Sequence, residues 1–374
     1  MKVMGWIKGL WVCLVAVGIL VSITACSFGN DINKKIIVQG IGVDTAENGY
    51  LLSVHYLHAG AEDVTTDLIQ TQGQTVFEAL QNLTLQTGRI PTYAHNAMVV
   101  FGKDCAENGF TDVFDFFSHH YEIRPTVQLF VAHERAEALF RIKNSDSYLL
   151  AIQAKSYAEA GDSANTFTNS TILNITNQMA SECHAFAVPE LKSSHNENIQ
   201  LGDIAYFRDN HLIGYFDREQ TKGYLAAAHS LQSGSLVLDI PNIGTIGLKI
   251  KKTNKKVTAQ IIDGIPHFQI DVTCDGYISE ISRDIEKTIS ETTHQQFENA
   301  LNQKLKTQIQ LAVDQAVIRD QVDIFYFGST LQQQQTAYWK AHKDTWGQDM
   351  VKMQYTVNVE SSLEHVQREA AAAF

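Results

Sequence analysis

The sequence predicts an α+β protein, with several mixed or antiparallel β-sheets that are each backed by α-helices. Residues 51–57 alternate between apolar and polar side chains, as a half-buried strand does. Residues 75–87 repeat apolar side chains at helical spacing, and residues 280–319 do so over a longer stretch. At roughly 100–200 residues per domain, the length predicts two or three domains, with one long amphipathic helix in the C-terminal half.

The first 130 residues predict the element order ββαβαβ. A turn at Glu47-Asn48-Gly49 joins the two strands of a hairpin. The later elements are a helix over 75–87, a strand over 97–102, a helix over 111–120 and a strand over 127–131. Residues 134–182 are expected to be mostly helical, and 185–188 return to a strand. The polar stretch 193–198 predicts a loop and a domain boundary.

The second half begins with another predicted hairpin and a helix. Four strands then follow, the last two joined by a turn at Asp263-Gly264. These elements are expected at 203–216, at 219–232, and at 236–240, 246–252, 256–262 and 267–277. The long helix over 280–319, a helix over 330–342 and a closing strand over 353–359 complete the chain.

Composition and charge exclude some function classes. The chain has 374 residues and a net charge of −12, which makes it a poor ligand for nucleic acid. Its densest basic run, at 249–256, falls where a hairpin is expected. A solvated strand edge explains these lysines better than a site for an anionic ligand.

The N-terminal segment has the features of a lipoprotein signal peptide. Lys2 and Lys8 precede an apolar stretch over 9–23, which as a helix spans roughly 22 Å, less than the ~30 Å of a bilayer core. Ile23-Thr-Ala-Cys26 then resembles the bacterial lipobox, in which the Cys thiol receives a diacylglycerol. We expect residues 1–25 to be removed and Cys26 to become the lipidated N-terminus, with fatty acids such as palmitate. An uncleaved membrane anchor is the alternative, and either would place the rest of the chain outside the cytoplasm.

No motif in the sequence predicts catalysis, a cofactor or a metal site. GxSxG, Walker-type, HExxH and GxGxxG patterns are all missing. His119-His120 fits a solvated helix end better than a chelating pair, and Cys183-His184 fits a buried Cys beside a surface His. Asp44, Glu47 and Asn48 suit a hairpin turn better than a cation site. Cys105, Cys183 and Cys274 allow at most one disulfide, which the sequence neither requires nor excludes.

Taken in order, several blocks resemble one known family. They are the lipobox at Cys26 and the stretches 41–44, 75–83, 94–102, 122–125, 212–225 and 322–328, followed by Tyr338-Trp339, Trp346 and the strand at 351–359. This ordered set is similar to the Ger(x)C family of spore-germination lipoproteins, the C subunits of GerA-type nutrient germinant receptors. The resemblance covers nearly the whole chain, although no single block is specific.

The resemblance implies a non-enzymatic subunit with no catalytic residues, folded as about three packed α+β subdomains. It implies a signal peptide over 1–25, an N-terminal domain over 27–197 with two α+β subdomains divided near 133, and a C-terminal domain over 203–370. The implied partners are the polytopic A- and B-type receptor subunits, and the implied place is the outer face of the inner spore membrane, where the lipid anchors the chain.

Two other hypotheses remain open from the sequence. One is a lipid-anchored extracytoplasmic solute-binding protein of an importer, and the other is a cell-surface enzyme whose site carries no recognised motif. The sequence names no germinant and no partner surface. Trp339 and Trp346 suit a core better than an interface, but either is possible.

Overall fold

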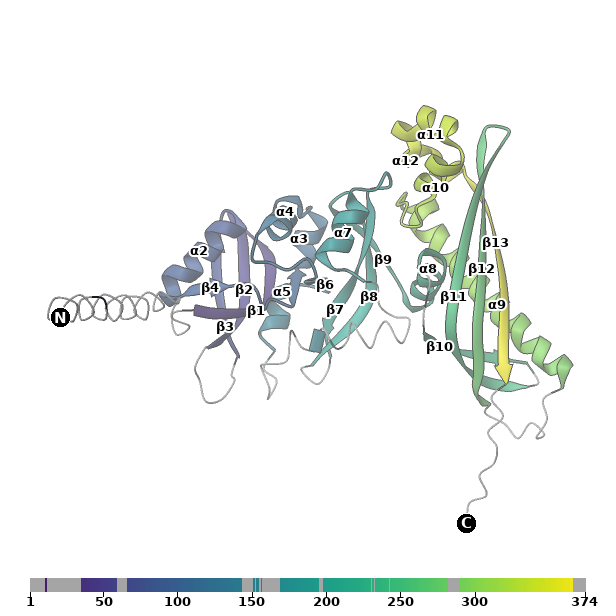
Figure 1. The fold of residues 1–374 in the computed structure, drawn as a ribbon, viewed down its shortest axis with the longest axis horizontal. Coiled ribbons are helices and arrows are strands. Elements are labelled where there is room, and N and C mark those ends of the chain that lie inside the picture. The colour runs from purple at the N-terminus through teal and green to yellow at the C-terminus, as the bar shows by residue number, and fades with distance from the viewer. Residues whose placement is uncertain are drawn as a thin grey trace, which may run out of the picture.

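We describe the chain from a computed structural model. The residues that it describes are 11, 35–58, 66–142, 151, 153, 154, 156, 169–194, 198–229, 231, 233–241, 243–281 and 290–365. Within them, strands and helices form two α+β layers that follow one another along an elongated body (Figure 1). The α+β class predicted from the sequence is confirmed.

The first layer contains a nine-stranded sheet within the described residues, in the order β3-β2-β1-β5-β6-β7-β8-β9, with β4 paired to the start of β1. Antiparallel pairs flank a parallel centre made of β1, β5, β6 and β7. The strands are β1 (Lys35–Ala46), β2 (Gly49–His58), β3 (Thr66–Gly73), β4 (Ile90–Thr92), β5 (Met98–Phe101), β6 (Gln128–Ala132), β7 (Ala185–Ser193), β8 (Ile199–Arg208) and β9 (His211–Phe216).

Helices cover both faces of this sheet. One face packs against α2 (Val76–Thr87), α3 (Lys103–Glu107), α4 (Thr111–His119) and α7 (Ile172–Met179). The other face packs against α5 (Ala136–Phe140), which contributes Leu139 and Phe140 to a smaller core. Strands covered on both faces are apolar in continuous runs, which is why all four residues of β5 are buried.

The second layer is a four-stranded sheet of described residues, in the order β10-β11-β12-β13. β11 (Gly244–Ile262) and β12 (Ile265–Ile281) form one long antiparallel pair, while β10 (Gly234–Ile240) pairs with the first part of β11. β13 (Gln354–His365) runs parallel to β12. The long helix α9 (Glu291–Val313) packs across this sheet through Phe297, Leu301 and Leu305.

The helix α8 (Arg218–Ala228) joins the two layers. Its core includes Tyr206 and Phe216 from the first sheet together with Phe268 from the second. Asp217 caps the helix, because its Oδ1 accepts from the backbone N–H groups of Glu219 and Gln220 while the Gln220 side chain accepts from the Asp217 N–H. The capping box at Asp217 therefore fixes where α8 begins, between the two sheets.

The short helices α10 (Phe327–Gln334), α11 (Thr336–His342) and α12 (Trp346–Asp349) pack beside the β11–β12 turn (Figure 1). Trp339 and Trp346 are each 3% exposed there, so the preference for a core position is confirmed.

The predicted helix over 280–319 is wrong at its beginning. Glu280 and Ile281 end strand β12, where they pair with Gly247 and Ile246, and Ile285 and Ile289 lie outside the described residues. The helix begins after Ser290, whose Oγ accepts from the Thr293 N–H. Its last residues, Asp314–Arg319, wind as a π-helix. Apolar spacing did not reveal the boundary, because cross-strand pairing decided it.

The hairpin expected around the lysine run at 249–256 is also wrong. Residues 244–262 form one strand, and the run lies in its middle, paired with β12 except at a register shift around Lys251. Among the described residues, pairing of β11 with β10 ends at Ile250, and Lys251, Lys252 and Lys256 are exposed beyond it, as a solvated strand edge requires. Lys255 differs, because it is half-buried and its Nζ donates to the Ala228 carbonyl oxygen. The prediction also missed β3, because its sequence TDLIQTQG is mostly polar.

The loop at 193–198 joins two strands of the same sheet. β7 and β8 pair antiparallel across it, and β6 and β7 pair across position 133. The first sheet is thus continuous from β3 to β9. The predicted subdomain division near residue 133 therefore falls between two paired strands of one sheet. The domain limits 27–197 and 203–370 stay predictions.

His229, the C-cap residue of α8, lies at the junction of the layers and predicts a pH-dependent stability. The ring packs edge-on against Tyr224 and hydrogen-bonds its hydroxyl, and burial lowers the pKa of His229 to about 4. In the unfolded chain the pKa is near 6.5, so between these values only the unfolded state binds the proton. We expect the free energy of unfolding to fall by about 2 kcal/mol from pH 7 to pH 5 through this residue.

Urea unfolding at both pH values checks this. His229→Gln should lose that part of the pH dependence, while His184→Gln, at an exposed ring, should keep it. Equal pH dependence in the wild type and His229→Gln would contradict the assignment.

Candidate functional site

The predicted lipidation residue, Cys26, lies outside the described residues. The continuous description begins at Lys35, the first residue of β1. Among the described residues, the longest helices are too short or too polar to span a bilayer. The lipid anchor therefore stays a proposal.

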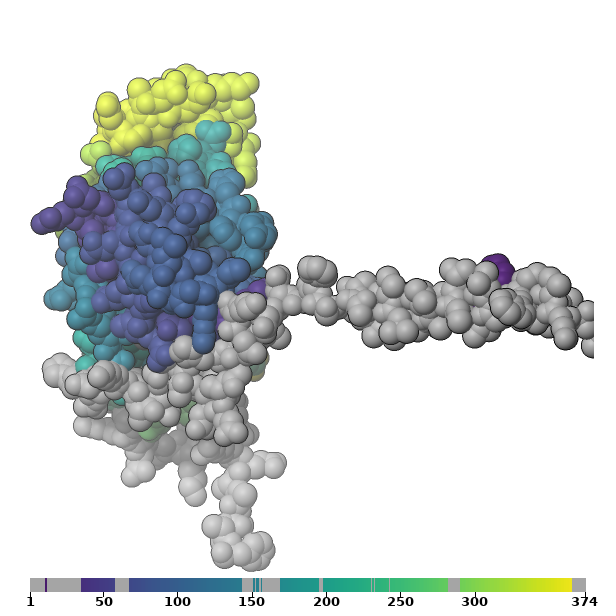
Figure 2. Space-filling model, turned by 90° about the vertical axis from the view of Figure 1, so that its left-hand side faces the viewer, coloured from purple at the N-terminus to yellow at the C-terminus, as the bar shows by residue number. Residues whose placement is uncertain are grey.

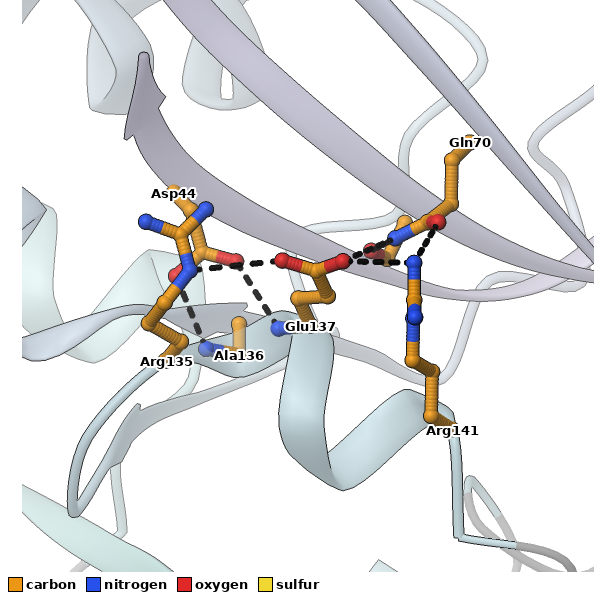
Figure 3. Close-up of polar contacts among 7 residues, drawn as sticks. Asp44, Gln70, Arg135, Ala136, Glu137 and Arg141 are labelled. Carbon is orange, nitrogen blue, oxygen red and sulfur yellow. Dashed lines mark hydrogen bonds and ion pairs between the residues drawn. The ribbon is translucent and has the colours of Figure 1, made fainter.

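Asp44 lies at the end of β1 and is 2% exposed. Its carboxylate accepts hydrogen bonds from the backbone N–H groups of Ala136 and Glu137, both at 2.8 Å, and so caps α5 (Figure 3). Burial raises the pKa of Asp44, and these two donors oppose the rise. Glu47 and Asn48 are exposed in the adjacent turn, so the three residues do not converge on a cation. In the part of the chain that is described, no cluster of His, Cys, Asp and Glu could hold a metal.

A polar groove of about 870 Å³ lies beside this cap. Its walls come from β2, β3, α2 and the α5 region, and its lining residues are Leu51, Gln70, Thr71, Gln72, Asn82, Leu85, Gln86, Arg135, Glu137 and Arg141. Amide side chains dominate, with one carboxylate between two guanidinium groups. Such a groove can hydrogen-bond a small polar molecule, but it offers no nucleophile with a neighbouring base.

The charges in the groove compensate one another (Figure 3). The Glu137 carboxylate lies 2.8 Å from Arg141 and 3.3 Å from Arg135, and accepts from Gln70 at 3.1 Å. Gln70 in turn accepts from Arg141 at 2.6 Å. The Gln70 hydrogen bond and then the two arginines lower the pKa of Glu137. A charged ligand would have to displace these contacts.

The two His-containing pairs do not form sites. His119 is exposed and bonds the Asp115 carbonyl oxygen, as a solvated helix end predicts. His120 is half-buried and stacks on Tyr121, so for this residue the solvated position is wrong. His184 is exposed, while Cys183 is buried, which confirms that interpretation.

The three cysteines after the N-terminal segment are buried and free in the described structure. Burial raises the pKa of the Cys105 and Cys274 thiols to about 12, which makes them poor nucleophiles. The disulfide that the sequence left open is not formed among them.

Asp323 is the most connected buried carboxylate. It is 2% exposed, and it accepts from the N–H groups of Phe327 at 2.8 Å and Gly328 at 2.6 Å and from the Trp346 indole at 2.9 Å. The Cys183 thiol donates to it at 3.2 Å, from the loop before β7. Asp323 thus caps α10, hydrogen-bonds Trp346 of α12 and, through Cys183, connects the first layer to the second. This explains why an acidic residue stands inside the apolar stretch 322–327.

Asp323→Asn should therefore destabilise the fold by about 2 kcal/mol, because a carboxamide cannot accept all four hydrogen bonds and turns its own donor toward other donors. Thermal and urea unfolding measure this loss. Asp344→Asn, at an exposed position in the same helical region, is the matched control and should leave stability unchanged. Equal stability of both variants would contradict the role given to Asp323.

Sequence reasoning missed a group of exposed apolar side chains at the end of the first layer. Phe77 and Leu85 on α2, Ile90 on β4 and Tyr121 after α4 are 57%, 81%, 60% and 88% exposed. The amphipathic pattern placed Val76, Leu80 and Leu83 correctly in the core. Phe77 and Leu85 are apolar but lie outside the buried face of α2, and this departure from the amphipathic pattern is the sequence feature that could have revealed the group.

Comparisons with known proteins agree with one another. The family model "Spore germination protein N-terminal domain" matches residues 29–193, and "Spore germination B3/ GerAC like, C-terminal" matches residues 202–367. The spore germination protein KC of Bacillus subtilis (strain 168) is 20% identical over 373 residues, which is 90% of this chain and 91% of that protein. The putative spore germination protein YfkR of the same strain is 20% identical over 319 residues, 81% of this chain and 83% of that protein.

A solved structure supports the same fold. The crystal structure of the GerBC protein aligns with a TM-score of 0.59 and 16% identity, over 87% of this chain and 96% of that one. At this identity the likeness shows a shared architecture, and it supports the α+β class.

Proposed function

Because the chain belongs to the Ger(x)C family of spore germination proteins, we propose that it is the lipid-anchored C subunit of a nutrient germinant receptor. In this role it takes part in germination through contacts with the polytopic A- and B-type subunits. It would lie on the outer face of the inner spore membrane, attached by the lipid on Cys26.

One observation carries the proposal. Two family models match in order along the chain, at 29–193 and 202–367, so the resemblance extends over both layers of the fold. The lipobox sequence before Cys26 supports the anchor, since it offers a thiol after two small residues.

The described surface supports a role in interaction. The polar groove carries compensated charges, the three free thiols are buried, and no metal cluster lies among the described residues. We propose that the protein acts by contact with partner subunits, as the family match supports, and we propose no enzymatic activity.

Co-purification tests this function. A tagged chain, solubilised from spore membranes with mild detergent, should bring down two polytopic membrane proteins, and spores lacking the chain should fail to respond to a nutrient. An unrelated tagged spore lipoprotein serves as the control. Normal nutrient response without the chain, together with no co-purified polytopic protein, would refute the proposal.

A second candidate function is a solute-binding protein, and the amide-lined groove favours it. Isothermal titration of residues 27–374 with amino acids and sugars separates the two candidates. Tight binding that Gln70→Ala and Arg141→Ala abolish would support the solute-binding function.

A further inference from the structure

The apolar side chains at the end of the first layer form one surface. Phe77, Ile90 and Tyr121 line a shallow hollow of about 380 Å³, together with Leu80, Gln81, Thr84, Pro91, Tyr93, Phe116, His120 and Glu122. We call Phe77, Ile90 and Tyr121 the end patch. Clustered apolar side chains of this kind mark an interaction surface, whereas single ones do not.

The position of the end patch relative to the predicted anchor is the second observation. β4 pairs with the start of β1, and Ile90 is the direct partner of Lys35. Only eight residues, 27–34, lie between Cys26 and Lys35. Even fully extended, such a segment reaches at most about 30 Å. The end patch therefore lies at the one place in the described structure where the chain leads to the lipid.

Figure 2 looks onto this end of the molecule, which is coloured purple to blue. The elongated body extends away from it toward the second layer (Figure 1). An anchor within about 30 Å of Lys35 keeps this end near the bilayer, so that its exposed side chains meet the headgroup region first. Tyr and Phe suit that region, because they combine an apolar ring with tolerance for a polar boundary.

We propose that the end patch inserts into the interfacial region of the lipid bilayer and so orients the body of the protein on the membrane. The inference rests on the proposed lipid anchor at Cys26. The occupant is lipid rather than a partner protein because the short connection to the acyl chains keeps the patch close to the bilayer whether or not a partner is present. The lipid anchor supplies attachment, and the end patch supplies orientation.

Site-directed spin labelling of the lipidated full chain tests this. Cys105, Cys183 and Cys274 are buried and Cys26 carries the lipid, so a nitroxide attaches selectively at Phe77→Cys, whose native side chain is 57% exposed. Val237→Cys, on the exposed face of β10 in the second layer, is the matched control at 60% exposure. The vesicles contain equal parts of phosphatidylcholine and phosphatidylglycerol. Tyr121→Cys replaces Phe77→Cys if that variant does not fold.

The inference predicts that, in vesicles, the label at Phe77→Cys collides severalfold less with a water-soluble nickel chelate, and more with oxygen, than the label at Val237→Cys. Chain that floats with the vesicles but shows equal nickel accessibility at both positions would overturn the inference and leave the anchor intact. A label at Phe77→Cys that is shielded only when receptor subunits are present would also overturn it, in favour of a protein contact. Chain that does not float at all would refute the anchor and this inference with it.

Discussion

Replacing Cys26 by Ala should detach the protein from the membrane or leave it unprocessed, and nutrient-triggered germination should fall to the level of spores that lack the chain. The thiol of Cys26 is the only group in the lipobox sequence that can take a diacylglycerol. Two or three acyl chains give stable attachment, since each buried CH₂ contributes about 0.8 kcal/mol. Without them, the acidic mature chain has no electrostatic attraction to an anionic bilayer, and the small end patch alone does not hold it there.

Fractionation of spore membranes and mass spectrometry of the N-terminal peptide measure this effect. Ser27→Ala is the matched control, because it alters the adjacent residue and leaves the thiol, and it should be lipidated and retained. Membrane retention and normal processing of Cys26→Ala would refute the anchor. Release of the variant with unimpaired germination would leave the anchor intact and separate it from the function.

Gly223→Ala should destabilise the protein by about 3 kcal/mol or more, because it forces apart the two helices that join the layers. A Cβ at Gly223 would lie 2.0 Å from the backbone carbonyl oxygen of Gln308 on α9. A backbone atom inside a helix cannot move aside as a side chain can. The separation would also strain the contacts of Glu219 with Lys304 and Gln308.

Differential scanning calorimetry measures this loss as a lower melting temperature. Gly347→Ala is the matched control, because it lies in the helix α12 with nothing within 4 Å of the new Cβ. Alanine favours helix over glycine by roughly 1 kcal/mol, so this variant should be as stable as the wild type or slightly more stable. If both variants melted at the same temperature, the close approach of α8 to α9 would not be a determinant of stability.

Much of the secondary structure could be predicted because caps, turns and apolar spacing within a single segment were enough to identify its helix or strand. Thr75 before an amphipathic stretch marks the beginning of α2, and its Oγ accepts from the Glu78 N–H as an N-cap should. Asp263-Gly264 marks the β11–β12 turn, where both residues have positive φ. Such signals depend on neighbours in the sequence.

The predictions failed where distant residues decide the outcome. Residues 280 and 281 have the apolar spacing of the long helix, yet pairing with β11 makes them the end of a strand. The lysines at 249–256 resemble a turn, yet a partner strand keeps them extended. The polar strand β3 carries no signal of its own, because its pairing with β2 supplies the stabilisation.

The candidate sites also divide into those that the sequence determines and those that depend on contacts between distant residues. The sequence by itself determined the predicted lipidation at Cys26, the acidic character of the chain and the ordered blocks that place it in its family, because each is a property of residue types in order. Only the tertiary structure decided that Asp323 meets Cys183 and Trp346, and that Phe77, Ile90 and Tyr121 share one surface beside the start of β1. These groups come from separate elements, and packing of those elements, which depends on burial of apolar area over the whole chain, is what brings them together.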